Sequence, residues 1–184
     1  SNSTLKGVHF IGLCDQRNIP LLFLQNTTGF MVGSDAERGG IAKNSAKLVY
    51  AVSNTRVPRY TLVTGGSYGA GNYGMCGRGF RPRFMFMWPN ARLGGMNPDV
   101  GSSVLMDLRR ASISRHPATE EELAAYEAEL RRQFDEKSNP YYCTARVWDD
   151  GIIAPADTRS VLALCLATGA MQPQSLGHRP VYRM

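Results

Sequence analysis

One stretch decides how this chain of 184 residues folds: Val63-Thr-Gly-Gly-Ser-Tyr-Gly-Ala-Gly-Asn-Tyr-Gly-Met-Cys-Gly-Arg78. The apolar run Tyr60 to Val63 leads into it and predicts a buried strand. Small residues at the start of a helix let unpaired backbone N–H groups approach a ligand oxygen, and the helix dipole adds positive potential. The stretch therefore predicts a strand, a tight turn and a short helix whose first amides can stabilise developing negative charge. Tight packing of helix against strand is the competing interpretation.

Apolar strands and helical patterns alternate on both sides of this stretch. The runs at 21–24 and 84–88 predict two further buried strands, with a loop at 25–33 after the first. Thr119 and Glu122 form a capping box for a helix at 118–136, and Pro155 opens a last helix that Gly169 follows. Further helices are predicted at 4–17, 40–52 and 100–110, and an extended tail from 172. The alternation indicates an α/β domain with helices packed against a sheet.

Composition excludes several classes of protein. Hydrophobic residues make up 43% and charged residues 20% of the chain, as in a globular domain. The net charge of +6 comes from scattered arginines without a nucleic-acid motif, which argues against nucleic-acid binding. A solvated basic surface is the favoured interpretation, and an anionic ligand such as a CoA phosphate is the alternative. No apolar run approaches the roughly 18–20 residues that cross a bilayer, and the N-terminus shows no signal-peptide pattern. The four cysteines include no CxxC pair, which argues against a metal site and for reduced, buried thiols.

The usual catalytic motifs are missing from the glycine-rich stretch. It lacks the Lys-Ser/Thr pair of a phosphate-binding loop and a full dinucleotide fingerprint. Ser67 does not lie in a GxSxG elbow, so its hydroxyl is assigned no chemical role. The three histidines occur in no triad context, and His9 is interpreted as structural on an apolar helix face. A site without an acid, base or nucleophile indicates that cofactor and substrate bring the reactive groups, while the protein supplies amides and shape.

Several segments together resemble a known family. They are Gln16-Arg-Asn-Ile-Pro-Leu-Leu-Phe-Leu-Gln-Asn-Thr-Thr-Gly-Phe-Met-Val-Gly33, Gly40-Ile-Ala-Lys43, the run from Gly65 to Arg78, Pro82-Arg-Phe84, Trp88-Pro-Asn-Ala-Arg92, Asn139-Pro-Tyr-Tyr142, Ala145-Arg-Val-Trp-Asp-Asp-Gly-Ile-Ile153 and Pro155-Ala-Asp-Thr-Arg159. In this order they resemble the C-terminal half of the carboxyltransferase (β) subunit of biotin-dependent acyl-CoA carboxylases. The methylcrotonyl-CoA type is the most similar, the geranyl-CoA type comes next, and the propionyl-CoA type is more distant.

The resemblance implies a crotonase-like α/β fold, a superhelix of ββα units, in which residues 1–184 form the C-terminal carboxyltransferase domain. The N-terminal half of such subunits, which mainly binds acyl-CoA, is absent here, and the first strand of the C half is expected to be missing as well. Val181-Tyr-Arg-Met184 resembles the C-terminus of the family. The partners implied are acyl-CoA, an N-terminal half, a biotin carboxylase or biotin carrier subunit, and further copies in a homo- or hetero-oligomer. The implied compartment is the cytoplasm in bacteria and the mitochondrial matrix in eukaryotes.

The resemblance also implies a reaction and its residues. In the family, carboxybiotin delivers carbon dioxide in a closed site, and the enolate of the acyl-CoA attacks it. An oxyanion hole for the biotin ureido oxygen falls on the backbone amides of Ala70 and Gly71. Bulk at Gly71 is therefore expected to obstruct the ligand. The other residues implied in substrate binding are Phe30, Met31, Val32, Gly33, Gly69, Asn72 and Tyr73. Of these, Tyr73 is the candidate for selecting the acyl group, with packing as its competing role. Biotin is carried on a partner, and the chain itself holds no metal.

One segment departs from the family. Asn97-Pro-Asp-Val100 stands where the methylcrotonyl type usually has Gly-Gly-Glu-Gln, although Pro98 can still begin a helix. The departure bears on acyl specificity and on activity. Two alternatives stay open beside a carboxyltransferase component: a non-catalytic truncated paralogue or fragment that acts as an assembly module, and a CoA-ester decarboxylase of the same fold.

Overall fold

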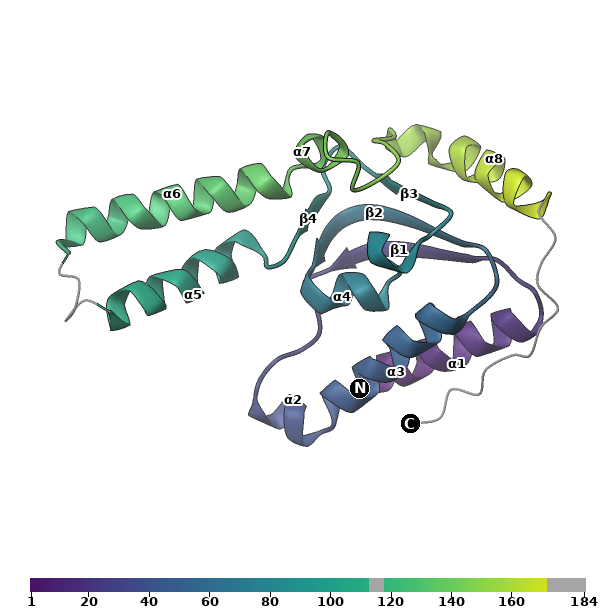
Figure 1. The fold of residues 1–184 in the computed structure, drawn as a ribbon, viewed down its shortest axis with the longest axis horizontal. Coiled ribbons are helices and arrows are strands. Elements are labelled where there is room, and N and C mark those ends of the chain that lie inside the picture. The colour runs from purple at the N-terminus through teal and green to yellow at the C-terminus, as the bar shows by residue number, and fades with distance from the viewer. Residues whose placement is uncertain (113–117, 172–184) are drawn as a thin grey trace.

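Four parallel strands form the centre of the molecule: β1 (Leu21–Thr27), β2 (Arg59–Tyr68), β3 (Phe84–Met87) and β4 (Arg92–Gly94). The structure is a computed structural model that describes residues 1–112 and 118–171. β2 lies between β1 and β3, and β4 pairs with the last residues of β2, beyond the end of β3 (Figure 1). The mixed α/β class and the parallel sheet agree with the prediction.

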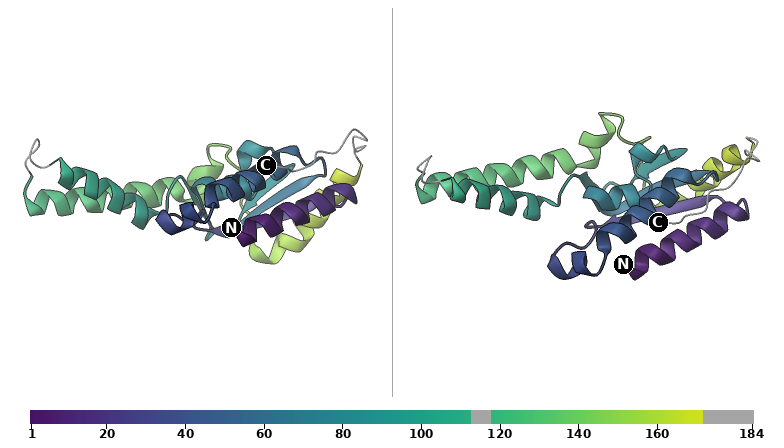
Figure 2. Two further views of the ribbon diagram at one scale, coloured as in Figure 1. Left: turned by 90° about the horizontal axis from the view of Figure 1, so that it is seen from below. Right: turned by 60° about the horizontal axis from the view of Figure 1, so that its bottom comes forward.

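Two helices next to β1 enclose the main core. Helices α1 (Asn2–Gln16) and α3 (Ile41–Asn54) lie side by side (Figures 1 and 2). Their apolar residues meet those of β1 in one buried cluster: Ile11, Cys14, Leu21, Phe23, Leu48, Ala51, Val52, Val57 and Cys76. A second cluster joins β2, β3 and α7 (Pro140–Thr144) through Val63, Met85, Met87, Ala91 and Cys143. β2 is paired with β1 on one side and with β3 and β4 on the other, so its end lies in the middle of the sheet.

A helical hairpin extends away from the sheet (Figures 1 and 2). It consists of α5 (Pro98–Ala111) and α6 (Glu120–Ser138), whose small core contains Met106, Leu123 and Leu130. The predicted capping box starts α6, with Thr119 and Glu122 satisfying each other's backbone N–H. Asn97 caps α5 by accepting a hydrogen bond from the Asp99 N–H at 2.9 Å, so the residues that depart from the family still begin a helix at Pro98.

The remaining elements are short, apart from the last helix. They are α2 (Ser34–Arg38), α4 (Gly69–Gly74), the 3-10 turns η1 (Arg78–Phe80) and η2 (Pro155–Asp157), and α8 (Thr158–Ala170). In the part of the chain that the structure describes, no helix is both long and apolar enough to cross a membrane.

Several predicted boundaries were wrong. β1 continues to Thr27, so the predicted loop at 25–33 begins with three strand residues, and β2 continues through the glycines to Tyr68. The last helix does not end before Gly169, because this glycine lies inside α8 and packs on Tyr60. Helices α2 and α7 and strand β4 were not predicted. The predicted extended tail from 172 lies outside the described residues.

Candidate active site

A bulge near the end of β2 turns the chain toward the candidate site. Gln25 of β1 is paired with Val63, but Thr27 is paired with Ser67, so β2 has two extra residues at this point. Gly65 and Gly66 occupy the bulge, where the Gly66 N–H donates to Asn26 Oδ1 at 3.1 Å. A Cβ atom on Gly65 would collide with the same Asn26 amide. A bulge changes the direction of a strand. After this bulge β2 continues through Ser67 and Tyr68 and leads directly into α4 at Gly69.

A buried polar network fastens α4 to both strands. Gln25 and Ser67 are fully buried. Gln25 Nε2 donates to the carbonyl of Met75 at 2.6 Å, and the Ser67 hydroxyl donates to Gln25 Oε1. Asn72 Nδ2 donates to Ser67 Oγ at 2.9 Å and to Gln25 Oε1 at 3.3 Å. Because each polar atom of Gln25 and Ser67 has a partner, burial costs little and the network holds α4 in one orientation.

The first turn of α4 needs small residues. Gly69 has φ +55°, and a Cβ there would lie 3.1 Å from the Gly95 carbonyl oxygen. A Cβ on Gly71 would lie 2.8 Å from the Cα of Gly29, so α4 and the loop after β1 touch backbone to backbone. Since α4 starts at Gly69, the N–H groups of Gly69, Ala70 and Gly71 precede the first one that can bond within the helix. The predicted order of strand, turn and helix is confirmed.

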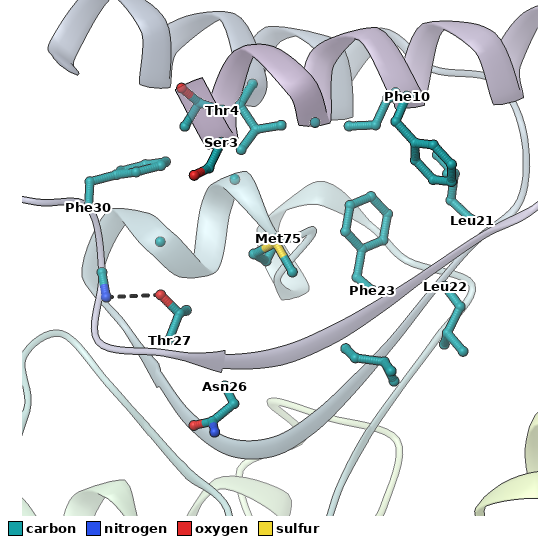
Figure 3. A pocket seen from close by; sticks show the side chains of 17 residues that line it. Ser3, Thr4, Phe10, Leu21, Leu22, Phe23, Asn26, Thr27, Phe30 and Met75 are labelled. Atoms are coloured by element: carbon teal, nitrogen blue, oxygen red, sulfur yellow. Dashed lines mark hydrogen bonds between the residues drawn. The ribbon is translucent and has the colours of Figure 1, made fainter. Parts of the chain in front are cut away.

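Two hollows share helix α4. A cleft of about 490 Å³ is lined by Gly69, Ala70, Asn72, Tyr73, Arg78, Gly79, Met85, Leu93, Gly94, Gly95 and Trp148. The other is an apolar cavity of about 420 Å³ between α1, β1 and α4, into which Phe10, Phe23 and Met75 project (Figure 3). Ala70 lines the cleft, whereas Gly71 lines the cavity. The two residues predicted to act together are adjacent, but they face different hollows.

Comparison with known proteins assigns the chain to a family. The family model of the carboxyl transferase domain matches residues 1–180. The chain belongs to the carboxyl transferase domain family. It is 55% identical to the biotin-dependent 3-methylcrotonyl-coenzyme A carboxylase beta1 subunit of Mycobacterium tuberculosis over 186 residues, which cover 100% of this chain and 35% of the relative. It is 53% identical to the mitochondrial methylcrotonoyl-CoA carboxylase beta chain of Arabidopsis thaliana, covering 100% of this chain and 32% of that one.

A solved structure of the same family has the same fold. The beta subunit of geranyl-CoA carboxylase from P. aeruginosa superimposes with a TM-score of 0.83 at 44% identity, over 97% of this chain and 34% of that subunit. The chain thus spans about a third of the length of the carboxyl transferase proteins that it matches.

The structure divides the predicted carboxyl transferase site residues into three groups. Gly69, Ala70, Asn72 and Tyr73 lie around the cleft, although the Asn72 amide is held in the buried network. Phe30 packs on Gly74 and on the main core, so its ring forms a wall of the apolar cavity. Met31, Val32 and Gly33 lie in the exposed loop before α2, with Met31 75% and Val32 86% exposed.

Sequence reasoning missed some residues of this carboxyl transferase domain. The hydroxyl of Ser67 has a structural role in the network, and Trp148 lines the cleft. His9 is exposed on α1, so its interpretation as a structural residue on an apolar face was wrong. The glycine with positive φ at the turn is Gly69. At Gly71 a side chain is excluded for a different reason, the close contact with the backbone of Gly29. The segment 145–153 carried a signal, because it resembles the family, but the pattern alone did not place it beside α4.

Two acidic residues follow Trp148. Asp150 pairs with Arg78, both of its oxygens lying 3.0 Å from Nη1. Asp149 is 2% exposed, and burial raises the pKa of its carboxyl, while hydrogen bonds from the Thr144 hydroxyl and the Gly151 N–H act in the opposite direction. Within residues 1–112 and 118–171, no group of three or more His, Cys, Asp or Glu could hold a metal ion.

Proposed function

We propose that this chain is the biotin-facing part of a carboxyltransferase, which transfers a carboxyl group from carboxybiotin to an acyl-CoA such as 3-methylcrotonyl-CoA. The main support is the extent of its similarity to methylcrotonyl-CoA carboxylase β subunits, which covers the whole chain. Residues 1–184 are then one C-terminal carboxyltransferase domain of the crotonase-like type, a superhelix of ββα units whose first strand lies outside this chain.

The first turn of α4 provides the backbone amides on which the proposal rests. Its three amides have no acceptor within the helix, and Ala70 is exposed at the cleft. The Ala70 side chain at the cleft is a single methyl group, so a ligand oxygen can come close to the backbone there. These features fit the ureido oxygen of biotin, which the amides of Ala70 and Gly71 would hold. Biotin supplies the carboxyl group when bound, and the chain stabilises negative charge and excludes water around the reacting atoms.

The proposed site needs partners. Biotin is carried on a biotin carboxylase or carrier subunit, and an N-terminal carboxyltransferase half binds most of the acyl-CoA. Met31, Val32 and Gly33 lie in the exposed loop before α2, where a partner or the biotin arm can cover them. The protein would act as an oligomer, in the cytoplasm if bacterial and in the mitochondrial matrix if eukaryotic, with no metal on this chain.

The test combines this chain with an N-terminal half and a biotin-carrying partner, and measures ATP- and bicarbonate-dependent carboxylation of 3-methylcrotonyl-CoA. Ala70→Val adds bulk at the exposed start of α4 and should lower the rate on the order of a hundredfold, the usual effect of losing an oxyanion contact. Ala128→Val is the matched control, because Ala128 is exposed on α6 and does not line the cleft.

Three outcomes would contradict the proposal. A folded Ala70→Val enzyme with the wild-type rate would remove the backbone of α4 from the chemistry. Biotin-independent release of carbon dioxide from a carboxylated CoA ester would favour a decarboxylase of the same fold. Assembly with both partners but no turnover of any acyl-CoA would favour a non-catalytic assembly module.

A further inference from the structure

The loop after α7 brings a large aromatic side chain to the same cleft as Ala70. Trp148 lines this cleft together with Tyr73, and the two side chains are 42% and 52% exposed. Met85 and Leu93 also line the cleft, so much of its wall is apolar. We propose that Trp148 is a specificity-determining residue that contacts the acyl group of the CoA ester opposite Tyr73. This inference rests on the proposed function and adds to it the binding surface for an apolar, branched acyl group.

The residue before Trp148 has an unusual backbone conformation. Val147 has φ +60°, a left-handed conformation that a β-branched residue rarely adopts. The Val147 N–H donates to the Thr144 carbonyl at 2.9 Å, and the Trp148 N–H donates to the Cys143 carbonyl at 3.2 Å. Such backbone strain persists only where surrounding contacts enforce it, and it concentrates at functional sites.

Asp149 fixes the loop from within. Its carboxylate accepts hydrogen bonds from the Thr144 hydroxyl at 2.8 and 3.0 Å and from the Gly151 N–H at 2.9 Å. A buried carboxylate with all these partners ties both ends of the loop together. Trp148 is therefore presented by a rigid segment and does not depend on the ligand for its position.

Asp150 fixes the loop to the sheet. Its carboxylate pairs with Arg78 and accepts the Met85 N–H at 2.7 Å, while its own N–H donates to the Met85 carbonyl at 2.7 Å. Met85 belongs to β3 and also lines the cleft. These bonds therefore fix the position of the loop that carries Trp148 relative to the cleft.

The indole of Trp148 is partly exposed. Its ring meets the Tyr142 ring edge-on at 6.0 Å. Among the described residues its N–H has no hydrogen-bond partner, whereas the other tryptophan, Trp88, donates to the Thr158 hydroxyl at 3.0 Å. Trp88 is thus anchored in the fold, but Trp148 leaves ring face and N–H available to a ligand. A rigid, exposed aromatic group beside a reactive site gives contact area at low entropic cost.

The experiment measures kcat and KM of the complete enzyme, with its N-terminal half and biotin-carrying partner, for 3-methylcrotonyl-CoA, geranyl-CoA and acetyl-CoA. Trp148→Ala should lower kcat/KM for 3-methylcrotonyl-CoA about tenfold, mainly through KM, because lost apolar contact at a pocket wall changes specificity by this order. The loss should be smaller for geranyl-CoA, whose longer chain can use the new space. Trp148→Phe should restore most of the activity. Tyr141→Ala is the control, since this tyrosine is 66% exposed and does not line the cleft.

The outcomes separate this inference from the proposed function. If the wild-type enzyme carboxylates no acyl-CoA, the proposed function fails and the inference falls with it. If the wild type is active but Trp148→Ala leaves the ratio of kcat/KM values among the three esters unchanged, only the role of Trp148 is refuted. A loss that Trp148→Phe does not restore, or that Tyr141→Ala reproduces, would also refute it. Thermal melting of each variant confirms that the compared enzymes are folded.

Discussion

Replacement of Gly71 by alanine tests the backbone contact that joins α4 to the loop after β1. The new Cβ would lie 2.8 Å from the Cα of Gly29, 3.3 Å from its carbonyl carbon and 3.4 Å from its nitrogen. All three are backbone atoms, so no rotation of a side chain can relieve the overlap. Overpacking of this kind costs about 1–3 kcal/mol. In a chain of this size about 1 kcal/mol corresponds to 2–4 °C, so the melting temperature should fall by roughly 2–12 °C.

The assay is thermal unfolding of the 184-residue chain, with Gly79→Ala as control. A Cβ on Gly79 meets nothing within 4 Å, so that variant should change stability by less than about 0.5 kcal/mol. Hydrogen exchange should also speed up at the amides of α4 in Gly71→Ala. If Gly71→Ala melts like the wild type, then α4 and the loop can separate freely. A larger side chain at Gly71 would then affect only ligand binding, as the sequence analysis predicts.

Three further predictions concern the network, the thiols and the isolated chain. Ser67→Ala removes one buried hydrogen-bond partner from Gln25 Oε1 and one from Asn72 Nδ2, so it should lower the free energy of unfolding in urea by about 1–3 kcal/mol. The control Ser53→Ala, on the exposed face of α3, should cost less than about 0.5 kcal/mol. Equal stability of the two variants would show that the fold does not need the network. Burial raises the pKa of the Cys76 and Cys143 thiols to about 11, so neither should react with a thiol reagent at neutral pH unless the protein is unfolded. Because these folded pKa values exceed the ordinary thiol pKa of 9.0, the free energy of unfolding should fall as pH rises from about 9 toward 11. A flat profile would contradict their burial. The chain without an N-terminal half should show no carboxyl transfer to 3-methylcrotonyl-CoA, and robust turnover would refute the proposal that it forms only part of a site.

The sequence predicted structure correctly where all the interacting residues lie close together in the chain. The capping box of Thr119 and Glu122 predicted the start of α6, because both partners of each hydrogen bond lie within four residues. Gly169 was misread as the end of α8, since its absent side chain serves a distant contact with Tyr60. Gln25 was assigned to a loop because it is polar, yet it is buried in β1 through bonds to Ser67 and Met75. These partners are far apart in sequence, and no window of the chain contains them.

The candidate site likewise depends on contacts between residues that are far apart in the sequence. The small residues from Gly69 to Gly71 indicated a close backbone approach, and the structure has one at each end of this run. The approaching groups are other parts of the chain, the Gly95 carbonyl and Gly29. A glycine pattern shows that something comes near but cannot say whether it is protein or ligand. Of the three residues only Ala70 is exposed, so a ligand would have to approach the first turn of α4 from the side of Ala70.

The lining of the cleft explains why the site lacks an acid or base of its own. Among the described residues that line it, the only charged side chain is Arg78, and this guanidinium is paired with Asp150. The remaining described lining consists of backbone, apolar groups, the Asn72 amide and the rings of Tyr73 and Trp148, so it offers no carboxylate, imidazole or thiol to take up a proton. A reaction in such a cleft must bring its reactive groups with the ligands. A cofactor that carries the group to be transferred, together with a thioester that becomes an enolate, meets this requirement. A hydrolytic reaction with a serine nucleophile does not, because no serine is among the described residues that line the cleft, and the Ser67 hydroxyl just before α4 is fully buried and bonded to Gln25 and Asn72.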